Sequence, residues 1–404
     1  MTDPARTVDH LRALGVELFT GVPDSLLKSF CSYIMAALPR KQHVIAANEG
    51  NAVAIALGHY LRTGRPALVY LQNSGFGNTV NPLLSLADPD VYGAPMVLLV
   101  GWRGQPGVKD EPQHVKQGRV QQALLDALEL PWAVLPHDDD GATRCLTEAV
   151  EVARERSCPY LVMVEKGTFA DAEVAADAEV AADTEVAADT AASATAAAGA
   201  DASAAASAPA PELPSREEAL EALVAAIGDD TINVSTTGML SRELFEHRQR
   251  TDASGERDFL TVGGMGHASS IALGVAQAEA DREVWCLDGD GALLMHMGAL
   301  AVIGDHAPAD YFHVVFNNGV HDSVGGQPTS VDVVDVPAVA AGCGYRYTAA
   351  TSDLTTLPDE VAAMREHGGP ALLELKVRPG NRPDIGRPTR TPEQSKQAFM
   401  AALG

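Results

Sequence analysis

Short apolar runs alternate with helix-like segments along almost the whole chain. In the first block, the runs 66–72 (PALVYLQ) and 95–101 (PMVLLVG) are separated from helical patterns such as 51–64 (NAVAIALGHYLRTG) by glycine and proline. A second block repeats the rhythm, with the runs 283–290 (EVWCLDGD) and 311–318 (YFHVVFNN). Strands that are apolar throughout, each followed by a helix, are typical of parallel sheets covered on both faces. We therefore expect an α/β protein with two doubly wound parallel sheets.

A low-complexity tract separates the two blocks. It contains the hexapeptides AEVAAD, AEVAAD and TEVAAD at 172–189 and no lysine or arginine between 171 and 210. Such a composition offers few large apolar side chains to bury, so we expect a disordered linker. The sequence thus predicts a first domain over 1–170, a linker over 171–214 and a second domain over 215–404.

Composition and charge exclude several classes of protein. The 404 residues carry a formal net charge of -25, which repels nucleic acid and anionic membranes. No apolar run reaches the ~20 residues that span a bilayer, and the N-terminus lacks the pattern of a secretory signal, so we expect a cytoplasmic protein. The five cysteines are scattered singly and indicate neither disulfides nor a zinc site.

Two polar motifs end neighbouring apolar runs of the second block. Gly289-Asp290-Gly291 ends one run, and Asn317-Asn318-Gly319 ends the next, with Asn318 twenty-eight positions after Asp290. Carboxylate and amide oxygens are ligands that Mg²⁺ accepts together with phosphate oxygens, and glycines let a phosphate approach the backbone. Either motif alone is a common turn. Together, each at a strand end, they predict a site for Mg²⁺ and a diphosphate.

This spacing resembles the signature of enzymes that use thiamine diphosphate (ThDP). The resemblance implies that 215–404 binds the diphosphate and 1–170 binds the pyrimidine, with Mg²⁺ held by Asp290, Asn318 and the Val320 carbonyl. It also implies that Met265 supports the bent cofactor and that the Gly263 carbonyl accepts from the 4′-amino group. The remaining cofactor-binding residues that we predict are Thr237, Gly289, Gly291 and Ala292.

A single acid, Glu49, lies between an apolar run and a long helical pattern. Without further context, it would be a helix N-terminal glutamate favoured by the helix dipole. The segment NEGNAVAIALGHYLRTG resembles the pyrimidine-binding segment of ThDP enzymes, which implies that Glu49 bonds to N1′ of the pyrimidine and activates the cofactor. Members of this family pair the pyrimidine domain of one subunit with the diphosphate domain of another, which implies a homodimer or a higher homo-oligomer.

A basic loop follows the run at 95–101. The segment 101–119 (GWRGQPGVKDEPQHVKQGR) holds four cations and His114 in an otherwise acidic chain. Individually these can be solvated surface charges, but as a cluster they suit a small polyanionic 2-oxoacid substrate, because arginine binds such oxyanions in a bidentate manner. The four cations are Arg103, Lys109, Lys116 and Arg119.

Five segments together resemble the phosphonopyruvate decarboxylase family: 19–30, 71–89, 101–119, 236–245 and 317–329. The resemblance implies decarboxylation of 3-phosphonopyruvate to phosphonoacetaldehyde and CO₂, in the biosynthesis of phosphonate antibiotics. It implies that His114 or His321 returns a proton after CO₂ has left. The residues expected to bind substrate are Asp24, Ser25, Asn73, Arg103, Lys109 and Arg119, and those expected on the same active-site loops are Ser74, Asp322 and Gln327.

Three other functions stay open. A sulfopyruvate decarboxylase would act on a sulfonate in place of the phosphonate, although such enzymes often divide the two domains between separate chains. A ThDP carboligase or 2-oxoacid oxidoreductase is disfavoured, since no flavin domain and no iron–sulfur cysteines are evident. A non-catalytic scaffold with the linker as its interaction element is disfavoured by the intact set of Glu49, Asp290 and Asn318.

Overall fold

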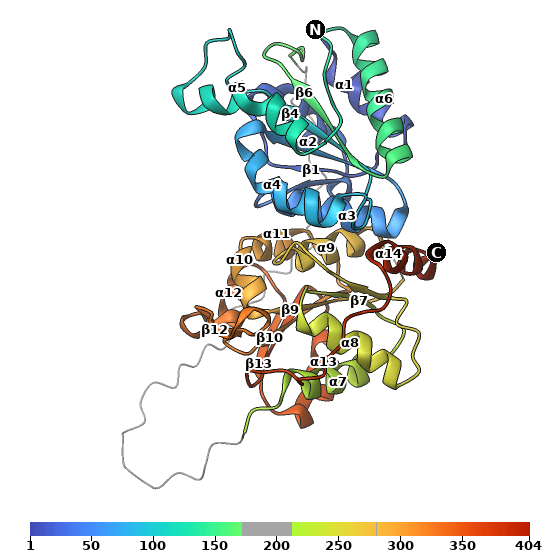
Figure 1. Cartoon of the computed structure of the whole chain (residues 1–404), viewed down its shortest axis with the longest axis vertical. Coiled ribbons are helices and arrows are strands. Elements are labelled where there is room, and N and C mark those ends of the chain that lie inside the picture. The colour runs from blue at the N-terminus through green and yellow to red at the C-terminus, as the bar shows by residue number, and fades with distance from the viewer. Residues whose placement is uncertain (172–211, 280) are drawn as a thin grey trace.

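The chain folds around two parallel sheets of six strands each (Figure 1). The structure is a computed structural model that describes residues 1–171, 212–279 and 281–404. The first sheet contains β1 (Phe19–Gly21), β2 (His43–Ile45), β3 (Ala67–Gln72), β4 (Met96–Gly101), β5 (Trp132–Val134) and β6 (Pro159–Val164). The second contains β7 (Ile232–Ser235), β8 (Asp258–Leu260), β9 (Val284–Gly289), β10 (Tyr311–Asn317), β13 (Tyr347–Thr351) and β14 (Ala371–Lys376). The predicted fold class, two doubly wound parallel sheets, is confirmed.

The two sheets share one topology. The strand order is β2-β1-β3-β4-β6-β5 in the first and, read in the same sense, β8-β7-β9-β10-β14-β13 in the second. In each sheet the order reverses between the first and third strands, β1 and β3 or β7 and β9. Ligands of open parallel sheets bind at the carboxyl ends of the strands beside such a reversal.

Helices cover both faces of each sheet, and central strands such as β3, β4 and β6 are accordingly apolar and buried on both sides. On the outer face of the first sheet lie α1 (Pro4–Ala13), α2 (Lys28–Ala37) and α6 (Asp139–Arg156). On the outer face of the second lie α7 (Arg216–Ile227), α8 (Met239–Arg250) and α13 (Leu357–His367). The inner faces carry α3 (Glu49–Thr63), α4 (Phe76–Pro82), α5 (Pro112–Ala127), α9 (Ala268–Ala278), α11 (Ala299–His306) and α12 (Val336–Gly342).

The two inner faces meet through α3 and α9, and one apolar core runs across the junction (Figure 1). The helices cross at two glycines. A Cβ on Gly58 would lie 2.0 Å from the carbonyl oxygen of Ile271, and a Cβ on Gly274 would lie 2.2 Å from that of Ile55. Only glycine permits this approach, so the crossing fixes how closely the two halves pack.

The C-terminal helix α14 (Pro392–Leu403) leaves the second sheet and packs against α3 of the first half (Figure 1). Its Phe399 is fully buried and packs against Phe259, which in turn contacts Tyr92 of the first half. Lys396 donates from Nζ to the carbonyl of Gly93 at 3.2 Å. The helix therefore fastens the two halves together from outside the sheets.

Some predictions concern regions that the structure leaves largely undescribed. Most of the predicted linker, 171–214, lies outside the described residues, and its disorder stays a prediction. Within the part of the chain that is described, no helix combines the length and apolarity needed to cross a bilayer.

Candidate cofactor site

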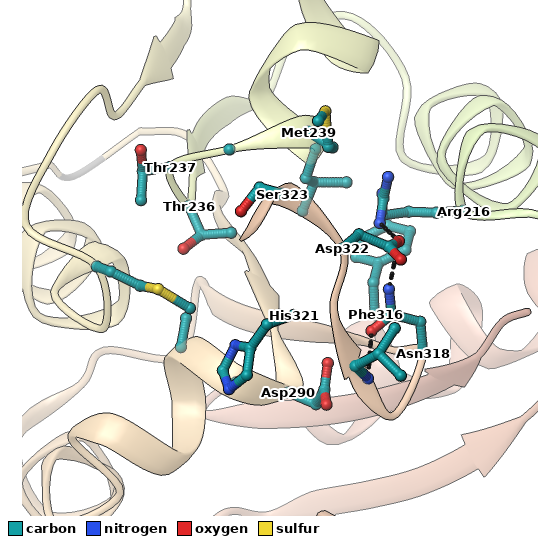
Figure 2. A pocket seen from close by; sticks show the side chains of 17 residues that line it. Arg216, Thr236, Thr237, Met239, Asp290, Phe316, Asn318, His321, Asp322 and Ser323 are labelled. Carbon is teal, nitrogen blue, oxygen red and sulfur yellow. Dashed lines mark hydrogen bonds and ion pairs between the residues drawn. The ribbon is translucent and has the colours of Figure 1, made fainter. Parts of the chain in front are cut away.

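A pocket opens at the carboxyl ends of β7, β9 and β10, beside the reversal of strand order in the second sheet (Figure 2). Most of the residues that the sequence assigned to the cofactor and metal line it together. They are Thr237, Met265, Gly289, Asp290, Gly291, Ala292, Asn318 and Val320, joined by His321 and Asp322. The sequence did not assign a role to the other polar residues of the lining, Arg216, Thr236 and Ser323.

Asp290 is the first residue of the short helix α10 (Asp290–Met295) and is only 3% exposed. Its Oδ2 accepts a hydrogen bond from Thr329 Oγ1 at 2.5 Å. Burial raises the pKa of this carboxyl, because a charge in a poorly solvated position is unfavourable without a counter-ion. A buried carboxylate whose side-chain partner is a neutral hydroxyl suits a bound cation.

The missing side chain of Gly291 leaves room for the ring of His321. A Cβ there would lie 2.6 Å from Cε1 of His321, and the imidazole of His321 points into the pocket beside Asp290 (Figure 2). His321 belongs to β11 (Val320–His321), which pairs with β12 (Gln327–Pro328) in a small hairpin that follows Asn318. The hairpin thus places His321 beside the Asp290 carboxylate.

Asn318 completes the predicted pair of metal-binding side chains. Its Nδ2 donates to Asp322 Oδ2 at 2.7 Å, while Oδ1 accepts from the Val320 amide at 3.2 Å. An amide oxygen has two lone pairs, so one remains for a metal. Asp290 and Asn318 side-chain oxygens with a backbone carbonyl form the hard donor set that Mg²⁺ takes beside phosphate oxygens, so the residues fit the ion.

The loop that carries Met265 is held by the first half of the chain. Ser85 Oγ accepts from the Gly264 amide at 3.1 Å. Gly263 packs against Ser85, because a Cβ added to Gly263 would lie 2.6 Å from the Ser85 carbonyl oxygen. Met265 lines the pocket, whereas Gly263 does not. His267 follows and bonds from its ring to the Gly264 carbonyl at 3.0 Å.

Glu49 begins α3, after the N-cap residue Asn48. Its carboxylate accepts from Asn78 Nδ2 at 2.8 Å. It is half-buried and does not line the pocket of Figure 2. The adjacent Gly50 lies against the ring of His267, where an added Cβ would be 2.9 Å from Nε2. The Glu49 end of α3 therefore lies beside His267, which follows Met265, within a single chain, and the predicted pairing of domains between subunits stays a prediction.

A second polar cluster lies at the carboxyl ends of β1, β3 and β4 in the first half. Arg103 donates from Nη1 to Ser25 Oγ at 2.9 Å, and its carbonyl accepts from Asn73 Nδ2 at 2.8 Å. Asp24 accepts from Gln72 Nε2 at 2.5 Å. Ser25, Asn73 and Arg103, three of the six residues expected to bind substrate, thus share one hydrogen-bond network, and a fourth, Asp24, lies near it and bonds to Gln72.

The partner of Arg103, Asp110, was not predicted from the sequence. Asp110 accepts from Nε and Nη2 along one edge of the guanidinium, with Arg103 Nε 2.8 Å from Oδ2, and these hydrogen bonds hold the pKa of Asp110 well below its ordinary value. Seven positions separate the two residues, a spacing that gave no signal because the loop between them is irregular. Arg103 is therefore neutralised by an acid in the protein as it stands.

The remaining predicted residues lie in different surroundings. Lys109, Lys116 and Arg119 are exposed and do not line the pocket, so the structure does not gather the basic loop into one cluster. His114 is buried, with Nδ1 lacking a partner among the described residues. Ser74 is exposed and donates to Gln72, and Gln327 is exposed on β12.

Comparison with known proteins agrees with this geometry. Residues 5–130 match the family "Thiamine pyrophosphate enzyme, N-terminal TPP binding domain", and residues 236–375 match its "C-terminal TPP binding domain". Solved structures with the same fold include benzoylformate decarboxylase from Polynucleobacter necessarius, with a TM-score of 0.70 and 13% identity over 95% of this chain and 100% of the other. A thiamin diphosphate-dependent enzyme from Mycobacterium smegmatis has a TM-score of 0.62 and 15% identity, over 94% of this chain and 100% of the other.

Two phosphonopyruvate decarboxylases share more sequence identity with this chain than these solved structures do. Phosphonopyruvate decarboxylase from Streptomyces viridochromogenes is 37% identical over 99% of this chain and 95% of its own length. The enzyme of the same name from Streptomyces hygroscopicus is 36% identical over 96% of this chain and 91% of its own length. Sulfopyruvate decarboxylase from Methanosarcina acetivorans is 25% identical over 98% and 97%. The chain belongs to the family of thiamine pyrophosphate enzymes that includes these phosphonopyruvate decarboxylases.

Proposed function

We propose that this protein decarboxylates 3-phosphonopyruvate to phosphonoacetaldehyde and CO₂, using ThDP and Mg²⁺. The observation that carries the proposal is the likeness, over nearly the full length, to two relatives named phosphonopyruvate decarboxylase. The pocket supports it, because Asp290 and Asn318 lie together at the strand ends where the diphosphate of a ThDP enzyme is expected. We further propose a cytoplasmic homodimer or higher homo-oligomer that serves phosphonate antibiotic biosynthesis.

The residues of the second half hold the cofactor in this proposal. ThDP, when bound, supplies the carbon nucleophile and the electron sink that the loss of CO₂ requires. Asp290, Asn318 and the Val320 carbonyl bind Mg²⁺, and the backbone around Gly289 and Gly291 accommodates the diphosphate. The predicted contacts of Thr237 and Ala292 with the diphosphate, of Met265 beneath the cofactor and of Gly263 with its amino group complete the set.

Glu49 holds a proton at the pyrimidine N1′ in this mechanism. A carboxylate bonded there favours the protonated ring and makes the exocyclic nitrogen basic. Asn78 keeps one carboxylate oxygen engaged and thereby orients the side chain. The role requires the start of α3 to face the Met265 loop, and the contact of Gly50 with His267 supports that placement.

The anionic ends of the substrate meet the cluster around Arg103. Asp110 engages the Nε–Nη2 edge of the guanidinium, so Nη1, now bonded to Ser25, is the group that we expect to bind a phosphonate oxygen. Asp24 and Asn73 orient the substrate, with Lys109 and Arg119 adding positive potential from the exposed loop. His321 or His114 delivers the proton that replaces CO₂, and His321 is the better placed because it points into the pocket.

One experiment tests the proposal directly. The protein is incubated with ThDP and Mg²⁺, and CO₂ release is compared for phosphonopyruvate, sulfopyruvate and pyruvate at equal concentrations. We expect the highest kcat/KM for phosphonopyruvate. A preference for sulfopyruvate would favour the alternative that the Methanosarcina acetivorans relative suggests, and a preference for pyruvate would contradict both assignments.

A further inference from the structure

The metal-binding amide of Asn318 has a charged neighbour whose role nothing so far explains. Asp322 Oδ2 accepts from Asn318 Nδ2 at 2.7 Å and from Arg216 Nη1 at 2.9 Å, as the dashed lines in Figure 2 show. Arg216 is the first residue of α7, and Asp322 follows the hairpin strand β11. Residues more than a hundred positions apart in sequence thus meet behind one metal ligand.

Asp322 determines which way the Asn318 amide faces. An asparagine side chain can present either its oxygen or its NH₂ group to a neighbour, and the neighbour's chemistry selects one. An ionised carboxylate only accepts hydrogen bonds, so the NH₂ group of Asn318 must face Asp322. The Oδ1 atom is then directed away from Asp322, as metal binding requires.

Three protein donors already engage Asp322, which makes it less available than Asp290 to bind the metal or the substrate itself. Its two oxygens offer about four lone-pair sites. The Gly380 amide lies 3.1 Å from Oδ1 and 3.2 Å from Oδ2, and Oδ2 also accepts from Arg216 and Asn318. Asp290 differs from Asp322, because the side chain that donates to its carboxylate is the neutral hydroxyl of Thr329.

The position of Asp322 depends in turn on a buried ion pair. Arg216 donates from Nε and Nη2 to the two carboxylate oxygens of Glu243, at 2.8 and 2.9 Å. The side chains of Arg216, Glu243 and Asp322 are 8%, 2% and 9% exposed. In such a poorly solvated position the bidentate pair holds the guanidinium in one orientation, with Nη1 left for Asp322.

We propose that Asp322 is a positioning residue for the metal ligand Asn318, and that the Arg216–Glu243 pair holds Asp322 in place for this task. The inference rests on the proposed function, because it assumes that Asn318 binds Mg²⁺. It changes the role of Asp322 from a residue on a substrate loop to one that acts through the metal site. It also gives Arg216, which lies two residues after the predicted linker, a part in cofactor binding.

The test is the affinity for Mg²⁺, measured by isothermal titration of the metal into the full chain with ThDP in excess. We expect Asp322→Asn to weaken Mg²⁺ binding by roughly 10- to 100-fold, the usual effect of losing a residue that orients a metal ligand. At saturating Mg²⁺ the variant should bind ThDP like the wild type and keep most of its kcat. Arg216→Lys keeps the positive charge but cannot make the bidentate hydrogen bonds to Glu243. We expect it also to weaken Mg²⁺ binding, by less than Asp322→Asn does.

The matched control is Asp384→Asn. Asp384 also pairs with an arginine, Arg382, on the segment that contains Gly380, but its side chain is 75% exposed. We expect this variant to bind Mg²⁺ like the wild type. Circular dichroism and thermal melting identify loss of fold in Asp322→Asn, and in that case Arg216→Lys carries the test.

Three results would overturn the inference. Unchanged Mg²⁺ affinity with a raised KM for substrate would make Asp322 a substrate-binding residue. Loss of Mg²⁺ binding that no concentration restores would make it a direct ligand. A wild-type protein that binds no Mg²⁺ in the presence of ThDP would overturn the proposed function along with the inference, so the two failures are distinguishable.

Discussion

Asn78 holds the carboxylate of Glu49 in one direction. Its Nδ2 donates to Oε2 at 2.8 Å, and the other oxygen, Oε1, occupies the space that the missing side chain of Gly75 leaves. A Cβ on Gly75 would lie 1.9 Å from Oε1. The turn before α4 therefore determines the position of the carboxylate that we expect to activate the cofactor.

The first prediction is that Gly75→Ala strongly lowers activity without unfolding the protein. Gly75 has ordinary helical backbone angles, φ −82° and ψ −8°, so alanine adds no backbone strain. Its methyl group would displace the Glu49 carboxylate, and a misplacement of about 1 Å in a catalytic group can reduce the rate about 10²-fold. Steady-state kinetics measures the loss, and the melting temperature should change little.

A nearby glycine supplies the control for that variant. Gly77 lies two residues further along, and a Cβ there meets nothing within 4 Å. Gly77→Ala should keep wild-type kinetics. Equal loss of activity in both variants would mean that the region tolerates no added methyl group. It would argue against a specific role of Gly75 in placing the Glu49 carboxylate.

The second prediction concerns Glu49 itself. Glu49→Gln keeps the shape of the side chain but cannot hold a proton between N1′ and a carboxylate, so we expect kcat to fall by about 10²- to 10⁴-fold. Glu49 is half-buried, and a glutamine can still accept the hydrogen bond from Asn78, so the fold should persist. Binding of ThDP and Mg²⁺, followed by calorimetry, should remain. Full activity in this variant would exclude the proposed mechanism.

The parts of the site that lie at strand ends could be predicted from the sequence. Asp290 and Asn318 each follow an apolar run, and parallel strands bring their carboxyl ends to one edge, so the spacing was enough to predict that they meet. Glu49 was recognisable as a lone acid opening a helix. In each case a regular element fixes the position of the residue, and the pattern of that element is visible in the sequence.

The contacts that adjust these residues could not be predicted. Thr329 on Asp290 and Arg216 on Asp322 join segments 39 and 106 positions apart, and neither lies in a periodic pattern. The loop of Arg103 gave a cluster of cations in sequence, but its irregular backbone directs only Arg103 inward and pairs it with Asp110. Loop conformation depends on tertiary contacts, which composition and periodicity do not encode.

A third prediction is that Thr329→Val weakens Mg²⁺ binding. Valine has the shape of threonine but cannot donate to Asp290 Oδ2, so the carboxylate loses its orienting partner. We expect the Mg²⁺ affinity to fall about tenfold or more, while saturating Mg²⁺ restores activity. Thr329→Ser, which keeps the hydroxyl, should retain most of the affinity in the same titration. Equal weakening in both variants would show that the methyl group, and not the hydrogen bond, matters.

The fourth prediction is loss of stability in mild acid. Burial lowers the pKa of His59 to about 4, and burial together with His296 lowers that of His267 to about 4, from 6.5. Both are neutral when folded, and the unfolded chain binds more protons below pH 6.5. The stability is therefore complete above about pH 6.5 and is lost as the pH falls toward 4, by up to about 3 kcal/mol for each histidine.

Urea unfolding at pH 7.5, 6 and 5 measures this dependence. His59→Gln should reduce the slope of unfolding free energy against pH, since glutamine does not titrate. His367→Gln, at an exposed position of α13, should keep the wild-type slope. If His59→Gln and the wild type lose equal stability between pH 7.5 and 5, the buried histidines do not cause the loss.

The last prediction concerns the helix crossing that sets the two halves against each other. Gly58→Ala would place a methyl group 2.0 Å from the Ile271 carbonyl, a backbone atom that cannot rotate away. The helices must separate, at about 1 to 3 kcal/mol of stability for the overpacking. Because α3 carries Glu49 and the Met265 loop leads into α9, the same displacement should lower kcat more than it lowers Mg²⁺ affinity, since the predicted metal ligands all lie in the second half. Gly342→Ala, in α12 with nothing within 4 Å of the added Cβ, is the matched control and should change neither. Kinetics, Mg²⁺ titration and urea unfolding of the two variants decide the point. A Gly58→Ala protein that loses stability but keeps its kcat would show that cofactor activation tolerates movement between the halves.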